Sequence, residues 1–351
     1  MKDIIADLKR WKEAGKTDIA LATIVETRGS SLRPAGTRMA LTTDGDIAGS
    51  VSSGCVDGDA VAEMEAVLAG SAVVRRPFFG VSDELAWSAG LSCGGAIDVL
   101  VERWDPIYDV LVSEIEVRQP VGFASSTDKS LVQAPAHLLH TADGKTYGTL
   151  GNADWDGEVL MDIAAAWPGP HAQKYSYKYG EVFLEVIAPP PTLLIFGATD
   201  IGIALARLAR DLDFEVIVSD ARRAFLREER FPGVDMRFGW PQDVFVPADF
   251  GTGWAVVVLF HDLKFDVPAL RLALKSQAFY VGFLGSRKTQ AERRASLLEV
   301  GFKEQDLARI YGPVGLNIGG KESTMIALSI LAEIVAVRHR RDGGMMSKKQ
   351  R

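Results

Sequence analysis

The sequence predicts an α/β protein: an N-terminal α+β domain followed by a C-terminal Rossmann-like domain with a doubly wound parallel sheet. Residues 189–191 are three consecutive prolines, which can continue neither a helix nor a strand ladder, so we expect the boundary there. Before them, helical and alternating patterns are mixed. After them, short continuous apolar runs alternate with helical patterns, which is typical of a parallel sheet covered on both faces.

The first domain is expected over residues 1–188. Its first helix is predicted over 3–14, where Ile4, Leu8 and Trp11 share a face. Strands are predicted over 18–26, 38–43 and 97–102, and a helix is predicted to begin just after residue 55. In the strand over 97–102, apolar and acidic residues alternate, so we expect one of its faces to be wet.

The second domain is expected over residues 189–338, and a basic, flexible tail over 339–351. Its apolar runs predict strands, and its helical patterns predict a helix over 200–212 and a last helix over 323–337. The predicted strands cover 193–196, 216–218, 255–260 and 279–284.

Composition excludes several classes of protein. The 351 residues carry a formal charge of −7, which argues against a general nucleic-acid binder. No apolar run approaches the roughly 18 residues that cross a bilayer, and the N-terminus lacks a secretory hydrophobic region. Two cysteines do not make a disulfide framework, and without a Cys-x-x-Cys or a His pair they do not indicate a zinc site. We therefore expect a cytoplasmic protein with free thiols.

The turn over 197–202 reads Gly-Ala-Thr-Asp-Ile-Gly and lies between a predicted strand and helix. Gly197 would allow the tight turn and Gly202 the close packing of helix on strand that a dinucleotide-binding fingerprint needs. Thr199 replaces the glycine that lets a pyrophosphate approach, so NAD(P) is disfavoured. Asp220, at the end of the next strand, is placed to bind ribose hydroxyls. A Rossmann domain without a ligand, or with a different ligand, is the alternative.

Two later loops follow predicted strands at the edge where doubly wound sheets bind ligands. Asp262 and Ser286 are expected to cap helices there. Arg287 has the better claim on an anion, because a guanidinium can grip a phosphate with two hydrogen bonds.

Both cysteines lie in polar, glycine-rich turns of the first domain. Cys55 follows Ser53 and Gly54 and precedes a predicted helix, whose first N–H groups favour a thiolate. Such a thiolate can ligate a soft metal, carry sulfur or line a pocket. The second turn contains Cys93 and Gly94. For both thiols, simple packing in a tight turn remains the alternative.

Residues 27–36 form a loop rich in anion donors. Its donors are Arg28, Ser30, Ser31 and Arg33. Such a set suits a phosphate or another polyoxygenated group, and a solvated surface turn is the alternative. Sequence alone does not show that this loop meets the cysteine turns.

These motifs resemble the XdhC/CoxI family, accessory proteins of molybdenum hydroxylases such as xanthine dehydrogenase, aldehyde oxidoreductases and carbon monoxide dehydrogenase. The resemblance covers nearly the whole chain. It rests on residues 26–36, 49–58, 93–95, 197–202, 282–287, 313–319 and 327–334. It implies a chaperone without turnover of its own that binds the molybdenum cofactor, a pterin dithiolene with a phosphate or nucleotide. The chaperone would support sulfuration of the cofactor by a cysteine desulfurase and insert it into an apo-molybdenum hydroxylase.

Carried onto this chain, the resemblance makes Cys55 the thiol nearest the molybdenum or its sulfur. The arginines and serines of residues 28–33 would hold phosphate or pterin oxygens. The family commonly has Gly-His at positions 199–200, where this chain has Thr-Asp, and often has Gly and Glu at positions 53 and 57. A homodimer is one oligomeric state that the resemblance allows. Two other functions stay open: an NAD(P)-dependent oxidoreductase and a ligand-free docking scaffold.

Overall fold

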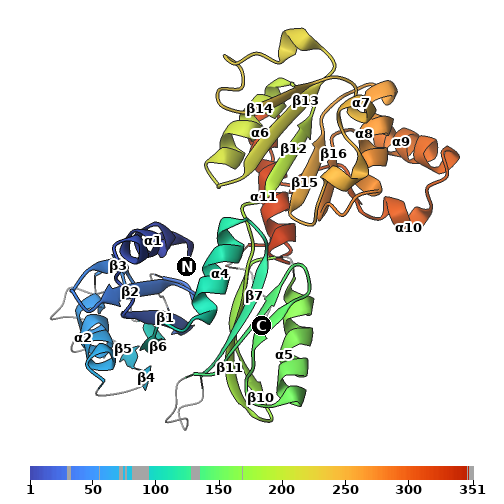
Figure 1. Ribbon diagram of the computed structural model, residues 1–351. Coiled ribbons are helices and arrows are strands. Elements are labelled where there is room, and N and C mark those ends of the chain that lie inside the picture. The colour runs from blue at the N-terminus through green and yellow to red at the C-terminus, as the bar shows by residue number, and fades with distance from the viewer. Residues whose placement is uncertain are drawn as a thin grey trace. The chain divides into compact units, whose positions relative to one another are not determined.

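The computed structural model describes the chain except residues 30–32, 55, 71–73, 76, 81–94, 128–134, 168, 346 and 348–351. It divides into two compact units, Met1–Pro189 and Pro190–Arg351, drawn in Figure 1. Among the described residues, no helix is both long and apolar enough to span a membrane.

The first unit contains two antiparallel sheets. The first sheet has the order β3-β2-β1-β6-β4, with β5 also paired to β6, and the second has the order β10-β11-β7-β8-β9. The first sheet is made of β1 (Ile19–Arg28), β2 (Arg38–Thr42), β3 (Ile47–Gly49), β4 (Val74–Arg75), β5 (Phe78–Gly80) and β6 (Ala96–Arg103). The second is made of β7 (Val121–Ser126), β8 (His137–Thr141), β9 (Thr146–Gly148), β10 (His171–Tyr177) and β11 (Gly180–Ile187).

Helix α2 covers one face of the first sheet and α5 covers one face of the second, while the other faces of the two sheets share a core with α1 and α4. The helices are η1 (Lys2–Ile4), α1 (Ile5–Glu13), α2 (Asp57–Leu68), α4 (Ile107–Glu116) and α5 (Ala153–Ala166). One apolar core joins α2 to the first sheet, and another joins α5 to the second. A third core lies between the sheets and includes side chains of α1 and α4. The unit is therefore α+β, as the sequence predicts.

The expectation of a wet face on the strand over 97–102 is wrong. Asp98 and Glu102 of β6 are only 8% and 2% exposed. They lie on the inner face of the first sheet, which the second sheet covers. An alternating pattern shows that a strand has two faces, but the elements packed on it decide whether the polar face meets water.

The second unit is a parallel sheet of order β14-β13-β12-β15-β16-β17. Its strands are β12 (Thr192–Phe196), β13 (Glu215–Asp220), β14 (Asp235–Phe238), β15 (Trp254–Val258), β16 (Tyr280–Phe283) and β17 (Ile310–Tyr311). Its helices are α6 (Asp200–Arg210), η2 (Arg223–Phe225), α7 (Pro241–Val244), η3 (Pro247–Asp249), α8 (Leu263–Leu274), α9 (Arg287–Glu299), α10 (Glu304–Leu307) and α11 (Ser323–Arg338).

Separate apolar cores cover the two faces of this sheet, so the doubly wound fold is confirmed. One core includes residues of α6 and α11, and the other includes residues of α8 and α9. The last helix matches its prediction. The helix over 200–212 ends earlier, at Arg210, and Leu212 is exposed rather than part of the core.

Candidate functional site

The strand order of the first sheet brings the ends of four strands to one edge. Arg28, the last residue of β1, pairs with Ala96, the first residue of β6. Gly49, the last residue of β3, pairs with Met39 near the start of β2. The last residues of β1 and β3 and the first residues of β2 and β6 therefore lie at the same edge of the sheet.

Arg33 and Ser53 meet at this edge. The Nε atom of Arg33 donates a hydrogen bond to the Ser53 hydroxyl oxygen at 3.1 Å. Ser53 has φ +59°, an unusual value for a residue with a Cβ, and Gly54 has φ +109° with open space where a Cβ would stand. This hydrogen bond joins the loop over 27–36, here called the arginine loop, to the turn that precedes Cys55.

Asp57 organises residues 50–54, here called the serine turn. Its Oδ1 accepts from the N–H groups of Val51 and Ser52 at 3.1 and 2.9 Å, and from the Ser52 hydroxyl at 2.7 Å. Its Oδ2 accepts from the Ser50 hydroxyl at 2.6 Å and from the Gly54 N–H at 2.9 Å. Partial burial raises the pKa of the Asp57 carboxyl, but these hydrogen bonds outweigh it and hold that pKa below its usual value.

Sequence reasoning missed this role of Asp57. The residue lies in the first turn of α2. The signal was present, because serines at 50 and 52 precede an acid at a helix start. Without coordinates, however, an acid there has several candidate donors.

Arg28 lies at the same edge but is tied to acidic neighbours. Its Nη2 atom is 3.4 Å from Glu26 Oε2 and 3.6 Å from Asp98 Oδ2, and its guanidinium lies over the Phe78 ring. Lys174 of β10 also pairs with Glu26, at 3.0 Å, and together the two cations lower the pKa of Glu26 to about 2. The Nε of Arg33 donates to the Ser53 hydroxyl, so the Arg33 guanidinium lies beside the turn that precedes Cys55.

A buried polar layer lies between the two sheets of the first unit. The His137 ring bridges two side chains: Nδ1 is 3.0 Å from the Ser125 hydroxyl, and Nε2 is 2.9 Å from Glu102 Oε2. Tyr108 donates its hydroxyl to Glu102 at 2.6 Å. These side chains belong to β6, β7, β8 and α4, so the network holds the framework that carries the loops.

Several residues singled out by the sequence lie outside the described residues. They are Ser30, Ser31, Cys55, Cys93 and Gly94. The roles given to them stay predictions, as do the anion-binding roles of Arg28, Arg33, Ser53 and Gly54.

In the second unit, Gly197 and Gly202 have the steric roles that the sequence indicates. Gly197 has φ +116° and lies against Leu259, while a Cβ on Gly202 would stand 2.7 Å from the Gly197 carbonyl oxygen. Thr199 caps α6, since its hydroxyl accepts from the Gly202 N–H at 3.2 Å.

The Asp220 carboxylate is fully buried and makes four hydrogen bonds within the unit. Oδ2 accepts from the Ala198 N–H and from Arg222 Nη2, both at 2.8 Å. Oδ1 accepts from the N–H and Nε of Arg222, at 2.8 and 2.9 Å. Asp220 therefore holds the glycine turn in place. Ribose binding by this residue stays a prediction.

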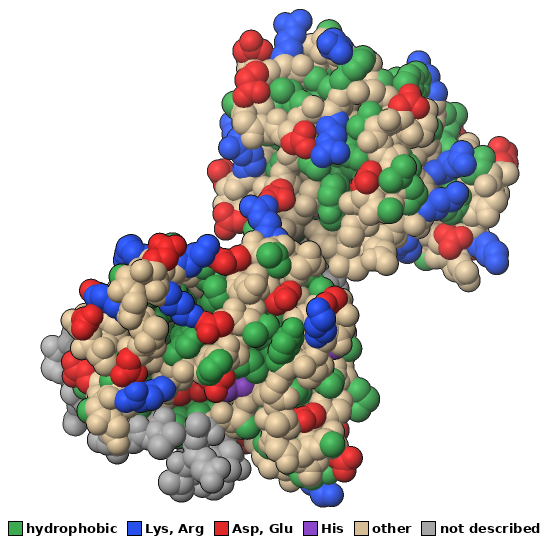
Figure 2. Space-filling model, viewed as in Figure 1, with side chains coloured by type: hydrophobic (Ala, Val, Ile, Leu, Met, Phe, Trp, Pro, Cys, Tyr) green, Lys and Arg blue, Asp and Glu red, His purple; other side chains and the backbone are tan. Residues whose placement is uncertain are grey.

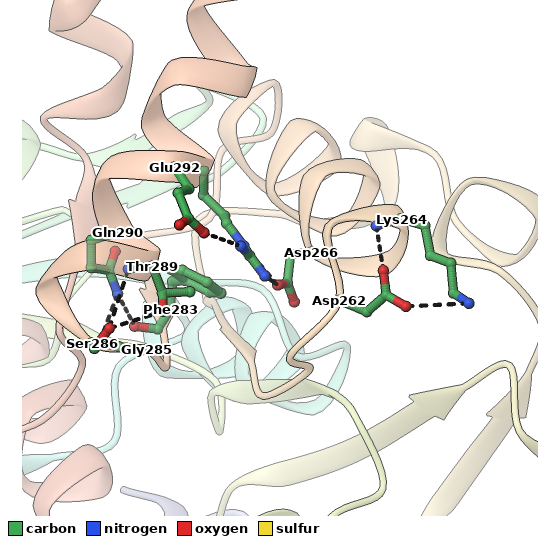
Figure 3. A network of polar contacts seen from close by, with 10 residues as sticks. Asp262, Lys264, Asp266, Phe283, Gly285, Ser286, Thr289, Gln290 and Glu292 are labelled. Atoms are coloured by element: carbon green, nitrogen blue, oxygen red, sulfur yellow. Dashed lines mark hydrogen bonds and ion pairs between the residues drawn. The ribbon is translucent and has the colours of Figure 1, made fainter.

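The loops after β15 and β16 begin helices α8 and α9, as Figure 3 shows. Asp262 and Ser286 cap them, accepting from the N–H groups of Lys264 and Thr289 at 3.1 and 3.2 Å, so both capping predictions are confirmed. Arg293 of α9 donates to Asp266 of α8 at 2.9 and 3.0 Å in a buried pair that joins the helices. Arg287 is exposed at the start of α9, and its anion-binding role stays a prediction.

The described side chains form no cluster of three or more His, Cys, Asp and Glu that could hold a metal ion. On the face seen in Figure 2, basic and acidic side chains are intermixed over both units.

Two family models match this chain. The model of the XdhC and CoxI family matches residues 11–76, which hold the arginine loop and the serine turn. The model of the XdhC Rossmann domain matches residues 193–334, which hold nearly all of the parallel sheet. The chain belongs to the XdhC and CoxI family. The resemblance inferred from the motifs is confirmed.

Full-length relatives of this XdhC-type chain include two named bacterial proteins. One, from Bacillus subtilis, is described as a probable subunit of xanthine dehydrogenase and is 29% identical over 92% of this chain and 94% of its own length. The other is the molybdenum cofactor insertion chaperone PaoD from Escherichia coli, which is 28% identical over 91% of this chain and 83% of its own length.

A crystal structure described as a xanthine dehydrogenase from Bacillus halodurans has the same fold. It superposes with a TM-score of 0.65 at 23% identity, covering 97% of this chain and 98% of that one. At this identity the likeness shows the fold alone. The XdhC arrangement of an α+β unit followed by a Rossmann unit is thus found in a solved relative.

Proposed function

We propose that this protein is an accessory maturation factor that binds the molybdenum cofactor as cargo and inserts it into a molybdenum hydroxylase of the xanthine dehydrogenase type. The contact between Arg33 and Ser53 carries the proposal, because it joins the two motifs expected to hold the cofactor. The names of the relatives support the same role: one is a cofactor insertion chaperone and the other belongs by name to xanthine dehydrogenase.

The donors at the sheet edge fit an anionic, oxygen-rich guest. Arg33 would hold the cofactor phosphate, because its guanidinium offers several N–H donors and lies at the surface. Open space beside Gly54 leaves room for a ligand to approach the backbone. Asp57 would keep the serine turn in this shape through its five hydrogen bonds.

Cys55 directly follows Gly54 in the sequence and would supply the soft ligand. A thiolate is a softer donor than oxygen and would suit a metal that already carries sulfur ligands, and α2 begins two residues later with no side-chain cap at Val56. Free N–H groups at a helix start favour a thiolate. When bound, the cofactor supplies the redox-active metal of the client enzyme, and this chain only binds, orients and shields it.

The finer parts of the proposal concern partners and location. The apo-hydroxylase is the partner that the names of the relatives support. The proposal also includes sulfuration of the cofactor through a cysteine desulfurase, a homodimeric state and a cytoplasmic location. It places the domain limits at residues 188 and 338. An oxidoreductase or a ligand-free scaffold has no observation in its favour among the described residues.

Purification of the full chain from a host that makes molybdopterin tests the proposal. Molybdenum would be measured by mass spectrometry and the pterin by fluorescence after oxidation. About one pterin per chain is expected for the natural protein. Arg33→Ala and Cys55→Ala should each lower the pterin content about tenfold under dilute conditions, through the loss of one charge-assisted contact or of the soft ligand.

Arg10→Ala is the matched control. Arg10 is an exposed arginine of α1 that pairs with Asp7 on the same helix, so the pterin content should not change. An equal loss in all three variants would mean non-specific attraction. Natural protein that never carries pterin would defeat the proposed function.

A further inference from the structure

A cavity of about 420 Å³ lies in the second unit between α6 and the segment before β14. This volume is within the range of small-molecule sites, about 300–1,000 Å³. The lining includes the apolar residues Ile203, Phe231 and Val234 and the basic residues Arg207, Arg210 and Arg230. Apolar walls with a few convergent charges are typical of ligand pockets. The turn over 197–202 is not part of this lining, so the cavity is separate from the nucleotide position of a Rossmann fold.

The arginines of this cavity are held mainly by neutral acceptors. Arg210 donates to the Pro232 carbonyl oxygen at 2.5 Å, and the positive φ of Gly233 belongs to the turn on which this guanidinium rests. Arg230 donates to the Phe225 carbonyl oxygen at 3.1 Å. A carbonyl oxygen orients a guanidinium without neutralising its charge.

Acidic groups near the cavity only partly offset these charges. Asp211 lies in the lining, and Asp200 pairs with Arg230 at 3.1 Å but is itself mostly exposed. The guanidinium of Arg207 is exposed and has no hydrogen bond or ion pair among the described residues. At least one guanidinium is therefore available to an incoming anion.

We propose that this cavity binds a nucleoside monophosphate, with the phosphate on the arginines and the ring on the apolar wall. A guanidinium matches the geometry of phosphate oxygens with two parallel hydrogen bonds. The partly exposed side chains of Ile203 and Val234 supply apolar surface for a flat ring. The proposal does not rest on binding of the molybdenum cofactor, which is assigned to the first unit.

Calorimetric titration of the full chain with AMP, GMP, CMP and inorganic phosphate, at constant ionic strength, tests this site. At least one nucleotide should bind, and at least tenfold more tightly than inorganic phosphate. Arg207→Ala should weaken that nucleotide about tenfold, as expected for the loss of a hydrogen bond to a charged group. Because the guanidinium of Arg207 has no bonded partner among the described residues, the variant should fold normally, which circular dichroism would check.

Two further variants make the outcome decisive. Arg227→Ala removes an exposed arginine that does not line the cavity, and binding should not change. Asp211→Asn removes an acid from the lining, and binding should tighten. The proposal is overturned if no nucleotide binds or if phosphate binds as tightly as the nucleotides. It is also overturned if Arg207→Ala has no effect, or no larger effect than Arg227→Ala.

Discussion

His137 and Glu102 form a hydrogen-bonded pair between the two sheets of the first unit. Nε2 of His137 on β8 lies 2.9 Å from Oε2 of Glu102 on β6, and the side chains are almost fully buried. Burial lowers the pKa of His137, but the Glu102 carboxylate raises it more, so the net pKa is above its usual value. Protonation of His137 is therefore coupled to the packing of one sheet on the other.

The first prediction concerns the pH dependence of this pair. A raised pKa in the folded state stabilises the protein below the unfolded value, about 6.5. That contribution should be lost as the pH rises from about 6.5 through the folded pKa of His137. The free energy of unfolding would be measured in urea, with hydrogen exchange in β8 as the readout. His137→Asn should lower this free energy more at low pH than at high pH. His140→Asn on the same strand is the control. A stability difference independent of pH from about 5.5 to 8.5 would contradict the prediction.

The second prediction concerns Arg38 and Glu185, which join β2 to β11. Nη1 of Arg38 donates to Oε2 of Glu185 at 3.1 Å, and Nη2 donates to Oε1, with both side chains buried. Glu185→Ala should lower the free energy of unfolding of this unit by about 3–5 kcal/mol, because it leaves a buried guanidinium without its partner.

Double replacement provides the sharper comparison for this ion pair. Arg38→Met combined with Glu185→Leu should recover much of the stability lost in Glu185→Ala, since neither charge then stays buried. Arg237→Met breaks an exposed pair with Asp235 and should cost less than about 1 kcal/mol. Hydrogen exchange in β1 and β11 would report the first unit separately from the second. A double variant as unstable as Glu185→Ala argues against charge burial as the cause.

The third prediction separates Asp57 from Asp59. Both are acids in the first turn of α2, but Asp57 accepts the hydrogen bonds of the serine turn, and Asp59 is exposed. Asp57→Ala should lower stability by about 0.5–2 kcal/mol, the usual range for a lost cap, and lower pterin content about tenfold. Asp59→Ala should leave pterin content unchanged. Equal pterin content in both variants would show that the turn does not shape the site.

The fourth prediction concerns Gly202 in α6. A Cβ at this position would stand 2.7 Å from the Gly197 carbonyl oxygen, so the helix would have to move away from the turn. Gly202→Ala should destabilise the second unit by about 1–3 kcal/mol, as overpacked cores do. Gly253→Ala is the control, because no atom outside its neighbours lies within 4 Å of the added Cβ. Thermal unfolding followed by hydrogen exchange in β12 would compare them, and equal stabilities would count against the steric argument.

Local patterns in the sequence were sufficient to predict the fold of the second unit. The apolar run of β12, the glycines at 197 and 202 and the helical pattern after residue 323 predicted a doubly wound domain. The capping roles of Asp262 and Ser286 were also predictable. Each of these signals depends on residues a few positions apart, whose spacing is part of the sequence.

Only the tertiary structure decided which distant residues meet. Arg33 and Ser53 are twenty positions apart, and the strand order of the first sheet brings them within hydrogen-bond distance. The sequence pattern predicted that Asp98 and Glu102 face water, but the second sheet packs on them and buries both. A polar residue at a given spacing has the same local pattern whether water or another sheet covers it, because burial depends on contacts between segments far apart in the chain.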